Sequence, residues 1–243
     1  MTREEWVAKC QHWKAKWPVM QPEYLDDTHG LNIYAVLEAI HQHSPDDAVI
    51  MGDAGSAFYM IPQAYKIKAG QRLVHSQSQG DMGWALPAAI GVAKAGAKNV
   101  IAIMGDGSFM SNMQELAVIR EHDLPIKIII LNNRGYLSIK NTQEKFYGNV
   151  HGVDSETGLW FPNFADVAET FKLPFVKTWS TTTMDKHFRN IFLKPTPFIV
   201  DVMCVQTQQI LPSQSFKDGK QAPLHDMMPF LSDEELAAEM VNK

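Results

Sequence analysis

The chain has 243 residues, 45% of them hydrophobic, and a formal net charge of −5 at pH 7. This length can bury one substantial core, while the acidic balance excludes the basic surface that nucleic-acid binding requires. The chain starts without the apolar core of a signal peptide, and no apolar run approaches the roughly 20 residues of a membrane span. The two cysteines, Cys10 and Cys204, have no metal-ligand spacing. We therefore expect a soluble, cytoplasmic protein that binds neither nucleic acid nor membrane.

The predicted elements begin with an N-terminal arm. Residues 1–30 are linker-like, with a short helix within residues 1–25 and an extended lead-in around Pro18 and Pro22. Residues 31–41 carry apolar side chains at helical spacing and predict the next helix. Strands are then predicted at residues 48–51, 99–104, 126–131 and 198–204, and helices at residues 85–95, 111–122, 164–171 and 184–193. Residues 206–243 predict an irregular C-terminal arm, which leaves residues 31–205 as the main domain.

Two of the predicted helices carry N-terminal capping signals. Ser111 and Gln114 have the spacing of a capping box, so we expect them to open the helix at residues 111–122. Ser232 precedes three acidic residues and is expected to cap a short last helix.

Continuous apolar strands that alternate with helices predict a doubly wound α/β fold, a parallel sheet with helices on both faces. In such sheets the ligand binds in the crevice beyond the carboxyl ends of the strands. Three predicted strands end in short segments of Gly, Asp, Ser and Asn, at residues 52–55, 105–108 and 132–135. Since the carboxyl ends of parallel strands share one edge, these segments predict the position of the site.

The two later segments have the chemistry of a metal-bridged diphosphate site. Glycines let the backbone approach a ligand closely, and the N-terminus of the following helix favours an anion such as phosphate. Asp106 offers a carboxylate and Asn133 an amide oxygen. An oxygen-only set with a single anion suits Mg²⁺, which commonly takes further ligands from phosphate and water. Either segment alone is an ordinary turn, but the pair, each directly after a buried strand, favours a functional site.

The same residues resemble a known family. Gly-Asp-Gly-Ser at residues 105–108, followed after about 24 residues by Asn132 and Asn133, resembles the thiamine diphosphate motif. Residues 78–91 and the segments 114–117 and 124–127 are similar to acetolactate synthase-like enzymes. The resemblance covers roughly residues 31–204, as the diphosphate-binding domain that forms the carboxyl third of such enzymes. It implies thiamine diphosphate and Mg²⁺ as cofactors.

Roles for individual residues follow from this resemblance. Asp106 and Asn133 would ligate Mg²⁺ through their side chains and Gly135 through its carbonyl. Gly80 and Met82 would act in catalysis, because they contact the aminopyrimidine and the Met82 side chain forces the bent shape of the cofactor. The implied cofactor-binding set is Gly55, Ser56, Gly80, Met82, Gly105, Asp106, Gly107, Ser108, Asn133, Gly135, Tyr136 and Leu137.

The chain departs from the family pattern in two respects. Acetolactate synthases usually have Gln-His where this chain has Ser56 and Ala57, so a phosphate contact or a proton-handling group is missing or replaced there. The family's catalytic glutamate comes from a pyrimidine-binding domain, and residues 1–30 are too short to form one. We therefore expect a separate partner subunit that supplies this glutamate, in a hetero-oligomer built on a dimer.

The expected reaction is decarboxylation of a pyruvate-like 2-oxo acid, with transfer of the resulting acyl carbanion to an acceptor as a further possibility. A subunit of a two-chain sulfopyruvate-type decarboxylase is one alternative, and a non-catalytic cofactor-binding module is another. Residues 223–231 resemble the tail of acetolactate synthase-like proteins of polysaccharide pathways, which leaves carboligation to a sugar open. Dinucleotide binding is disfavoured, because no G-x-G-x-x-G follows a predicted strand.

Overall fold

A computed structural model describes residues 1–241 of the chain. Internal contacts divide it into two units, Met1–Gln208 and the residues from Gln209 onward, which are described separately. The division into residues 1–30, 31–205 and 206–243 stays a prediction.

The first unit is built on a six-stranded sheet in which every pair of neighbouring strands is parallel. The strand order is β2-β1-β3-β4-β6-β5. The strands are β1 (Val49–Gly52), β2 (Arg72–His75), β3 (Val100–Gly105), β4 (Ile126–Asn132), β5 (Phe175–Thr178) and β6 (Phe198–Met203). Since β2 and β3 lie on opposite sides of β1, the direction of winding reverses between β1 and β3, and such a switch point is where doubly wound sheets bind ligands.

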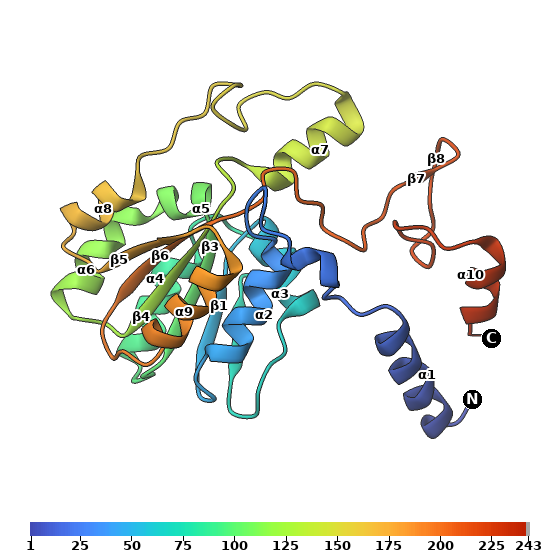
Figure 1. Cartoon of the computed structure of the whole chain (residues 1–243), viewed down its shortest axis with the longest axis horizontal. Coiled ribbons are helices and arrows are strands. Elements are labelled where there is room, and N and C mark those ends of the chain that lie inside the picture. Colours follow the sequence, from blue (N-terminus) through green and yellow to red (C-terminus); the bar gives the residue numbers. More distant parts are fainter. Residues whose placement is uncertain (242–243) are drawn as a thin grey trace. The chain divides into compact units, whose positions relative to one another are not determined.

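Helices cover both faces of this sheet (Figure 1). They are α2 (Ile33–His43), α3 (Ser56–Ala64), α4 (Ala85–Lys94), α5 (Asp106–Ser111), α6 (Leu116–Glu121), α7 (Leu137–Tyr147), α8 (Phe164–Thr170) and α9 (Thr181–Ile191), with a 3-10 turn η2 (Met113–Glu115). Every residue of β4 is buried, as covering on both faces requires. One face packs against α4, α6 and α8 in a continuous apolar core. The predicted α/β fold is confirmed.

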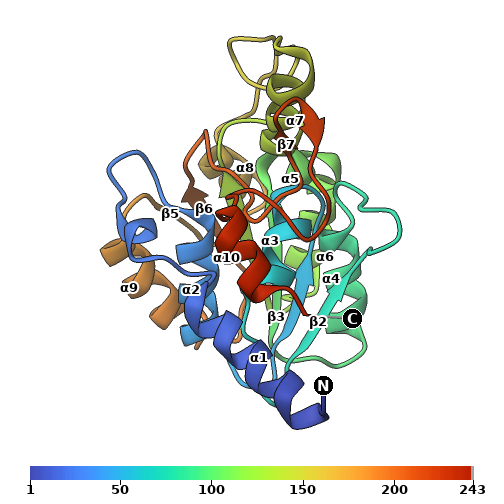
Figure 2. The same ribbon diagram turned by 90° about the vertical axis from the view of Figure 1, so that its right-hand side faces the viewer.

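Figure 2 shows α7 beyond one edge of the sheet, above α5. This helix follows β4 directly after a short turn, so it begins at the carboxyl edge of the sheet. The chain therefore places three helix starts, those of α3, α5 and α7, immediately after the carboxyl ends of β1, β3 and β4.

The predicted capping box at Ser111 is wrong. The helix that follows β3 begins at Asp106 and Ser111 is its last residue, with its Oγ donating to the Gly107 carbonyl oxygen at 3.4 Å. The turn η2 and helix α6 then follow as separate elements. Among these elements, the strands β2 and β5 and the helices α3, α5 and α7 were not predicted, and α6 begins five residues after the predicted start at residue 111. The other strands and helices of the first unit named so far lie within about three residues of the predicted bounds.

The N-terminal arm contains α1 (Arg3–Lys16), capped by Thr2 and with no buried residue, and the 3-10 turn η1 (Pro22–Leu25). The second unit contains the two-stranded antiparallel pair β7 (Phe216–Lys217) and β8 (Lys220–Gln221) and the helix α10 (Asp233–Glu239). Ser232 caps α10 by accepting from the Glu235 N–H, which confirms that prediction. None of the helices between residues 1 and 241 combines the length and apolar character that crossing a bilayer requires.

Candidate functional site

A cavity of about 240 Å³ lies at the carboxyl ends of β1, β3 and β4, at the switch point of the sheet. All twelve residues of the predicted cofactor-binding set line this cavity, although they come from four separate stretches of sequence. The further lining residues are Ala54, Tyr59, Leu131, Ser138 and Ile139. The fold thus brings the predicted set together, while the role of each residue stays a prediction.

Three helix N-termini meet at this cavity without a side-chain cap. Neither α3, α5 nor α7 has a side-chain hydrogen bond at its N-cap. The helices α4 and α6 also lack one, whereas α1, α2, α8, α9 and α10 have it. The first N–H groups of a helix have no partner within it and carry a partial positive charge. An anion in the cavity is therefore the natural partner of these three helix starts.

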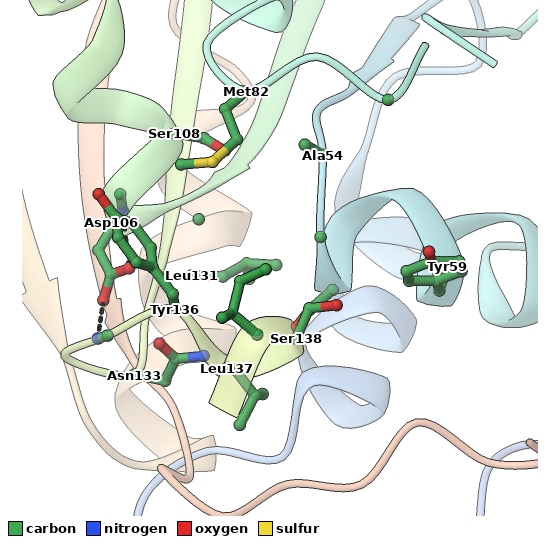
Figure 3. Close-up of a pocket in the computed structure, with 17 residues that line it drawn as sticks. Ala54, Tyr59, Met82, Asp106, Ser108, Leu131, Asn133, Tyr136, Leu137 and Ser138 are labelled. Atoms are coloured by element: carbon green, nitrogen blue, oxygen red, sulfur yellow. Dashed lines mark hydrogen bonds between the residues drawn. The ribbon is translucent and has the colours of Figure 1, made fainter. Parts of the chain in front are cut away.

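The Asp106 carboxylate faces the cavity from the start of α5. It is 1% exposed and accepts from the backbone N–H of Gly107 at 2.7 Å and of Gly135 at 3.0 Å, so it joins the ends of β3 and β4 (Figure 3). Burial raises the pKa of the Asp106 carboxyl to about 7, against the lowering effect of these hydrogen bonds. A cation beside the carboxylate would compensate the cost of burying its charge.

The two asparagines that follow β4 have different surroundings. Asn132 is turned into the protein, where its Nδ2 donates to Asp201 at 2.8 Å and its Oδ1 accepts from the Arg134 N–H at 3.1 Å. Asn133 lines the cavity, and its buried Oδ1 has no hydrogen-bond partner. Since buried polar atoms are nearly always satisfied, this oxygen indicates a ligand that the protein itself does not provide.

Gly80 and Met82 reach the cavity from the loop that precedes α4. Figure 3 shows Asp106, Asn133 and Tyr136 together on one side of the cavity, Met82 at its upper edge and Tyr59 on the opposite side. The Met82 side chain is 44% exposed. The polar groups therefore lie at one end of the cavity and an accessible thioether at another.

Glycines shape the polar end. A Cβ on Gly107 would lie 2.0 Å from the Tyr136 ring, so the close packing of α5 on the β4–α7 turn requires glycine there. A Cβ on Gly105 would meet no atom within 4 Å. At Gly105 the backbone is therefore open to whatever occupies the cavity.

Comparison with known proteins identifies the family of this chain. Residues 53–202 match the model of the family described as thiamine pyrophosphate enzyme, C-terminal TPP binding domain. The chain belongs to this thiamine pyrophosphate (thiamine diphosphate) enzyme family. The resemblance to the acetolactate synthase-like C-terminal domain is confirmed.

The relatives of this thiamine pyrophosphate enzyme domain include acetolactate synthases. The large subunit of Lactococcus lactis subsp. lactis (strain IL1403) is 29% identical over 212 residues, 86% of this chain and 35% of that protein. The large subunit of Porphyra purpurea is 29% identical over 208 residues, 85% and 34% of the two chains. Acetolactate synthase 2, chloroplastic, of Zea mays is 29% identical over 195 residues, 76% and 30%. The chain thus spans about a third of the length of the curated relatives it matches.

The residues of the cavity fit magnesium and the diphosphate of the family's cofactor. Within residues 1–241 no three His, Cys, Asp or Glu side chains lie close enough to hold a metal by themselves. Asp106 and Asn133 offer one carboxylate and one unpartnered amide oxygen, so a bound ion would need oxygens from its ligand. The Gly135 carbonyl accepts from the Leu137 N–H at 3.1 Å and keeps a second lone pair.

Sequence reasoning included Ser56 and Leu137, the first residues of α3 and α7, but missed three further lining residues of these helices. Tyr59 lies one helical turn after the Gly55 turn, and Ser138 and Ile139 lie in the first turn of α7. A helix predicted at each strand end would have placed them. Of the pair that differs from acetolactate synthases, Ser56 lines the cavity, whereas Ala57 is 1% exposed in the core.

Proposed function

We propose that this domain binds the diphosphate of thiamine diphosphate together with Mg²⁺ and forms half of an active site for a 2-oxo acid. The observation that carries the proposal is the convergence of three uncapped helix N-termini on Asp106 and on the unpartnered Oδ1 of Asn133. Positive helix ends match the phosphates, and the two side-chain oxygens match the metal that bridges them.

Each end of the cavity has its own task in this proposal. Asp106 and Asn133 hold Mg²⁺ through side-chain oxygens and Gly135 holds it through its carbonyl, while backbone N–H groups at Gly55, Ser56 and Ser108 donate to the diphosphate. Gly107 lines the cavity beside them, with its N–H donating to Asp106. Gly80 and Met82 contact the rings of the cofactor. When bound, thiamine diphosphate supplies the electron sink that loss of carbon dioxide from a 2-oxo acid requires.

The names of the relatives favour an acetolactate synthase-like reaction, in which a pyruvate-like 2-oxo acid is decarboxylated and the acyl group is transferred to an acceptor. This chain corresponds to about a third of those proteins, so the proposed active site needs a further domain. We infer a separate subunit that binds the pyrimidine and supplies a glutamate, in a hetero-oligomer. Met82 and Tyr59 line the cavity and are both exposed, which supports docking of such a domain over the cavity.

Binding of the cofactor by the purified chain tests the first half of the proposal. We expect calorimetry to detect binding of thiamine diphosphate that depends on Mg²⁺. Asp106→Ala should reduce this affinity by at least about 100-fold. Mutation of residues that only hydrogen-bond to a metal ligand already lowers metal affinity by about 10- to 100-fold, and Asp106 is proposed to be a ligand itself. Glu169→Ala, at an exposed position on α8, is the matched control and should bind as the wild type does. Equal affinities for the two variants would refute the metal site.

Turnover with a partner tests the second half. A chain that carries the missing pyrimidine-binding domain should, together with this one, release carbon dioxide from a 2-oxo acid, and Asp106→Ala should abolish the release. A reconstituted pair that binds the cofactor but releases no carbon dioxide from any 2-oxo acid, pyruvate and sulfopyruvate included, would leave a non-catalytic binding module instead.

A further inference from the structure

A buried carboxylate outside the cavity lining connects two sides of the site. Asp53 follows β1 and is 2% exposed. Its Oδ1 accepts from the N–H groups of Ala54 at 2.8 Å and Gly83 at 2.9 Å, and its Oδ2 accepts from the Ala85 N–H at 2.7 Å. One side chain therefore ties the end of β1 to the loop that carries Gly80 and Met82.

The same loop is held from its other side by the turn that follows α5. Asn112 donates from Nδ2 to the Gly83 carbonyl oxygen at 2.9 Å, and Gln114 donates to Asn112 Oδ1 at 3.0 Å. Gly83 has a φ of +82°, and a Cβ there would lie 2.7 Å from the Ser111 Cβ. Both the N–H and the carbonyl of Gly83 are thus fixed, which leaves the backbone beside Met82 little freedom.

Met82 itself is held differently. Met82 is 44% exposed and lines the cavity, so surrounding side chains enclose only part of it. The backbone bonds of its neighbour Gly83 set its position. A ligand whose diphosphate lies between Asp106 and Asn133 presents its remaining part to other walls of the cavity, and Met82 stands on one of them (Figure 3).

We propose that Asp53 is a positioning residue that sets Met82 for contact with the ring portion of the bound cofactor. The inference rests on the function proposed above. Asp53 acts through the N–H groups of Gly83 and Ala85, whereas Asp106 and Asn133 act on the diphosphate end. The simpler alternative is that Asp53 only caps α4, which has no side-chain cap of its own at Trp84. Capping alone would affect stability but would not discriminate between ligands.

Two ligands separate these cases, thiamine diphosphate and inorganic pyrophosphate, each measured with Mg²⁺ by calorimetry. Pyrophosphate has no ring portion, so it lacks the group that Met82 is proposed to contact. Asp53→Asn keeps the size of the side chain but replaces one accepting oxygen with a donor that faces an N–H. We expect this variant to lose about tenfold in affinity for thiamine diphosphate and less than about twofold for pyrophosphate, since bonds to a charged acceptor are among the stronger ones.

Gln71→Met is the matched control for lost stability. Gln71 is 8% exposed and bonds to Tyr65, Lys68, Ser44 and Pro45. It precedes β2 at the amino edge of the sheet, opposite the edge that carries the cavity. This variant should be less stable and yet bind both ligands with the wild-type ratio. Hydrogen exchange provides a direct reading of the loop. In Asp53→Asn the amides of residues 83–85 should exchange faster than in the wild type, while those of β4 should not change.

Asn112→Ala keeps the inference testable if Asp53→Asn fails to fold. It removes the hydrogen bond to the Gly83 carbonyl oxygen. This variant should also lower the affinity for thiamine diphosphate relative to that for pyrophosphate. Equal losses for the two ligands in both variants would overturn the positioning role and leave the proposed function intact. A wild-type chain that binds thiamine diphosphate no better than pyrophosphate would also overturn it. A wild-type chain that binds neither ligand would refute the proposed function itself.

Discussion

The chemistry of the site is concentrated in a carboxylate that the fold holds in an unfavourable place. Asp106 is 1% exposed, and burial raises the pKa of its carboxyl to about 7, although two backbone N–H groups donate to it. Asn133 contributes a buried oxygen without a partner at the same end of the cavity. Burying the carboxylate and the unpartnered oxygen costs free energy when no ligand is bound, and a divalent cation would offset this cost for both groups. Such a cost is expected where a site is built for its ligand before the ligand arrives.

The raised pKa of Asp106 predicts how binding depends on pH. Between pH 3.8, the ordinary carboxyl pKa, and about pH 7, the folded, cofactor-free chain binds a proton at Asp106 that the unfolded chain does not bind. The stability of the folded chain therefore falls as pH rises through this range. Mg²⁺ needs the ionised carboxylate, so its binding must displace the proton below about pH 7. We expect the affinity for thiamine diphosphate with Mg²⁺ to fall by about tenfold per pH unit below about 7 and to level off above it.

Calorimetry across this pH range checks the prediction. The protonation of the cofactor's diphosphate also depends on pH. It is measured separately, with Mg²⁺ and the cofactor in the absence of protein, and its contribution is subtracted from the pH dependence of the affinity. A corrected affinity that does not change with pH would show that Asp106 is already ionised in the free chain or does not bind the metal.

At the scale of the elements, the central strands could be predicted from sequence and the pieces around the site could not. The strand β3 is a continuous apolar run, and β4 and β6 are apolar apart from Lys127, Asn132 and Asp201, a pattern typical of a sheet covered on both faces. The edge strands β2 and β5 have four residues each and are largely half-buried, so they carry no such run. Helix α5 has six residues, too few for an apolar period, and the capping signal at Ser111 suggested a later start.

The junction of α5 with the β4–α7 turn predicts the effect of a single methyl group. In Gly107→Ala the new Cβ would lie 2.0 Å from the Tyr136 ring, so the ring must move. We expect a loss of about 1–3 kcal/mol in the free energy of unfolding, the usual cost of overpacking. Tyr136→Ala in the same chain should recover part of this loss, because it removes the clash. Chemical denaturation of the two single variants and the double variant measures the coupling.

Gly105→Ala is the contrasting control. A Cβ at this position meets no atom within 4 Å, so it should change the stability little and yet obstruct the cavity for the diphosphate. Additive effects of Gly107→Ala and Tyr136→Ala would show that the ring and the glycine do not pack against each other.

At the scale of the whole molecule, the site is a consequence of the strand order. The reversal of winding between β1 and β3 opens a crevice, and the chain places its glycine-rich turns where that crevice lies. Sequence reasoning therefore located the twelve predicted lining residues from strand ends and a family resemblance. It missed Tyr59, Ser138 and Ile139, since their positions depend on how α3 and α7 start rather than on any local motif.

All cavity residues and all six strands of the large sheet lie within Met1–Gln208, the first of the two units. We therefore predict that a chain ending at Gln208 folds and binds thiamine diphosphate and Mg²⁺ with an affinity within about threefold of the full chain, because it keeps every proposed contact. A chain ending at residue 197 is the control. It lacks β6, which lies between β4 and β5, so β5 loses its only neighbour in the sheet and the edge of β4 loses the backbone hydrogen bonds of its pairing with β6. Thermal unfolding and calorimetry of the two shortened chains decide the matter. If the chain ending at Gln208 folds but loses its affinity, residues beyond 208 take part in cofactor binding, and the site extends beyond the strand ends from which it was derived.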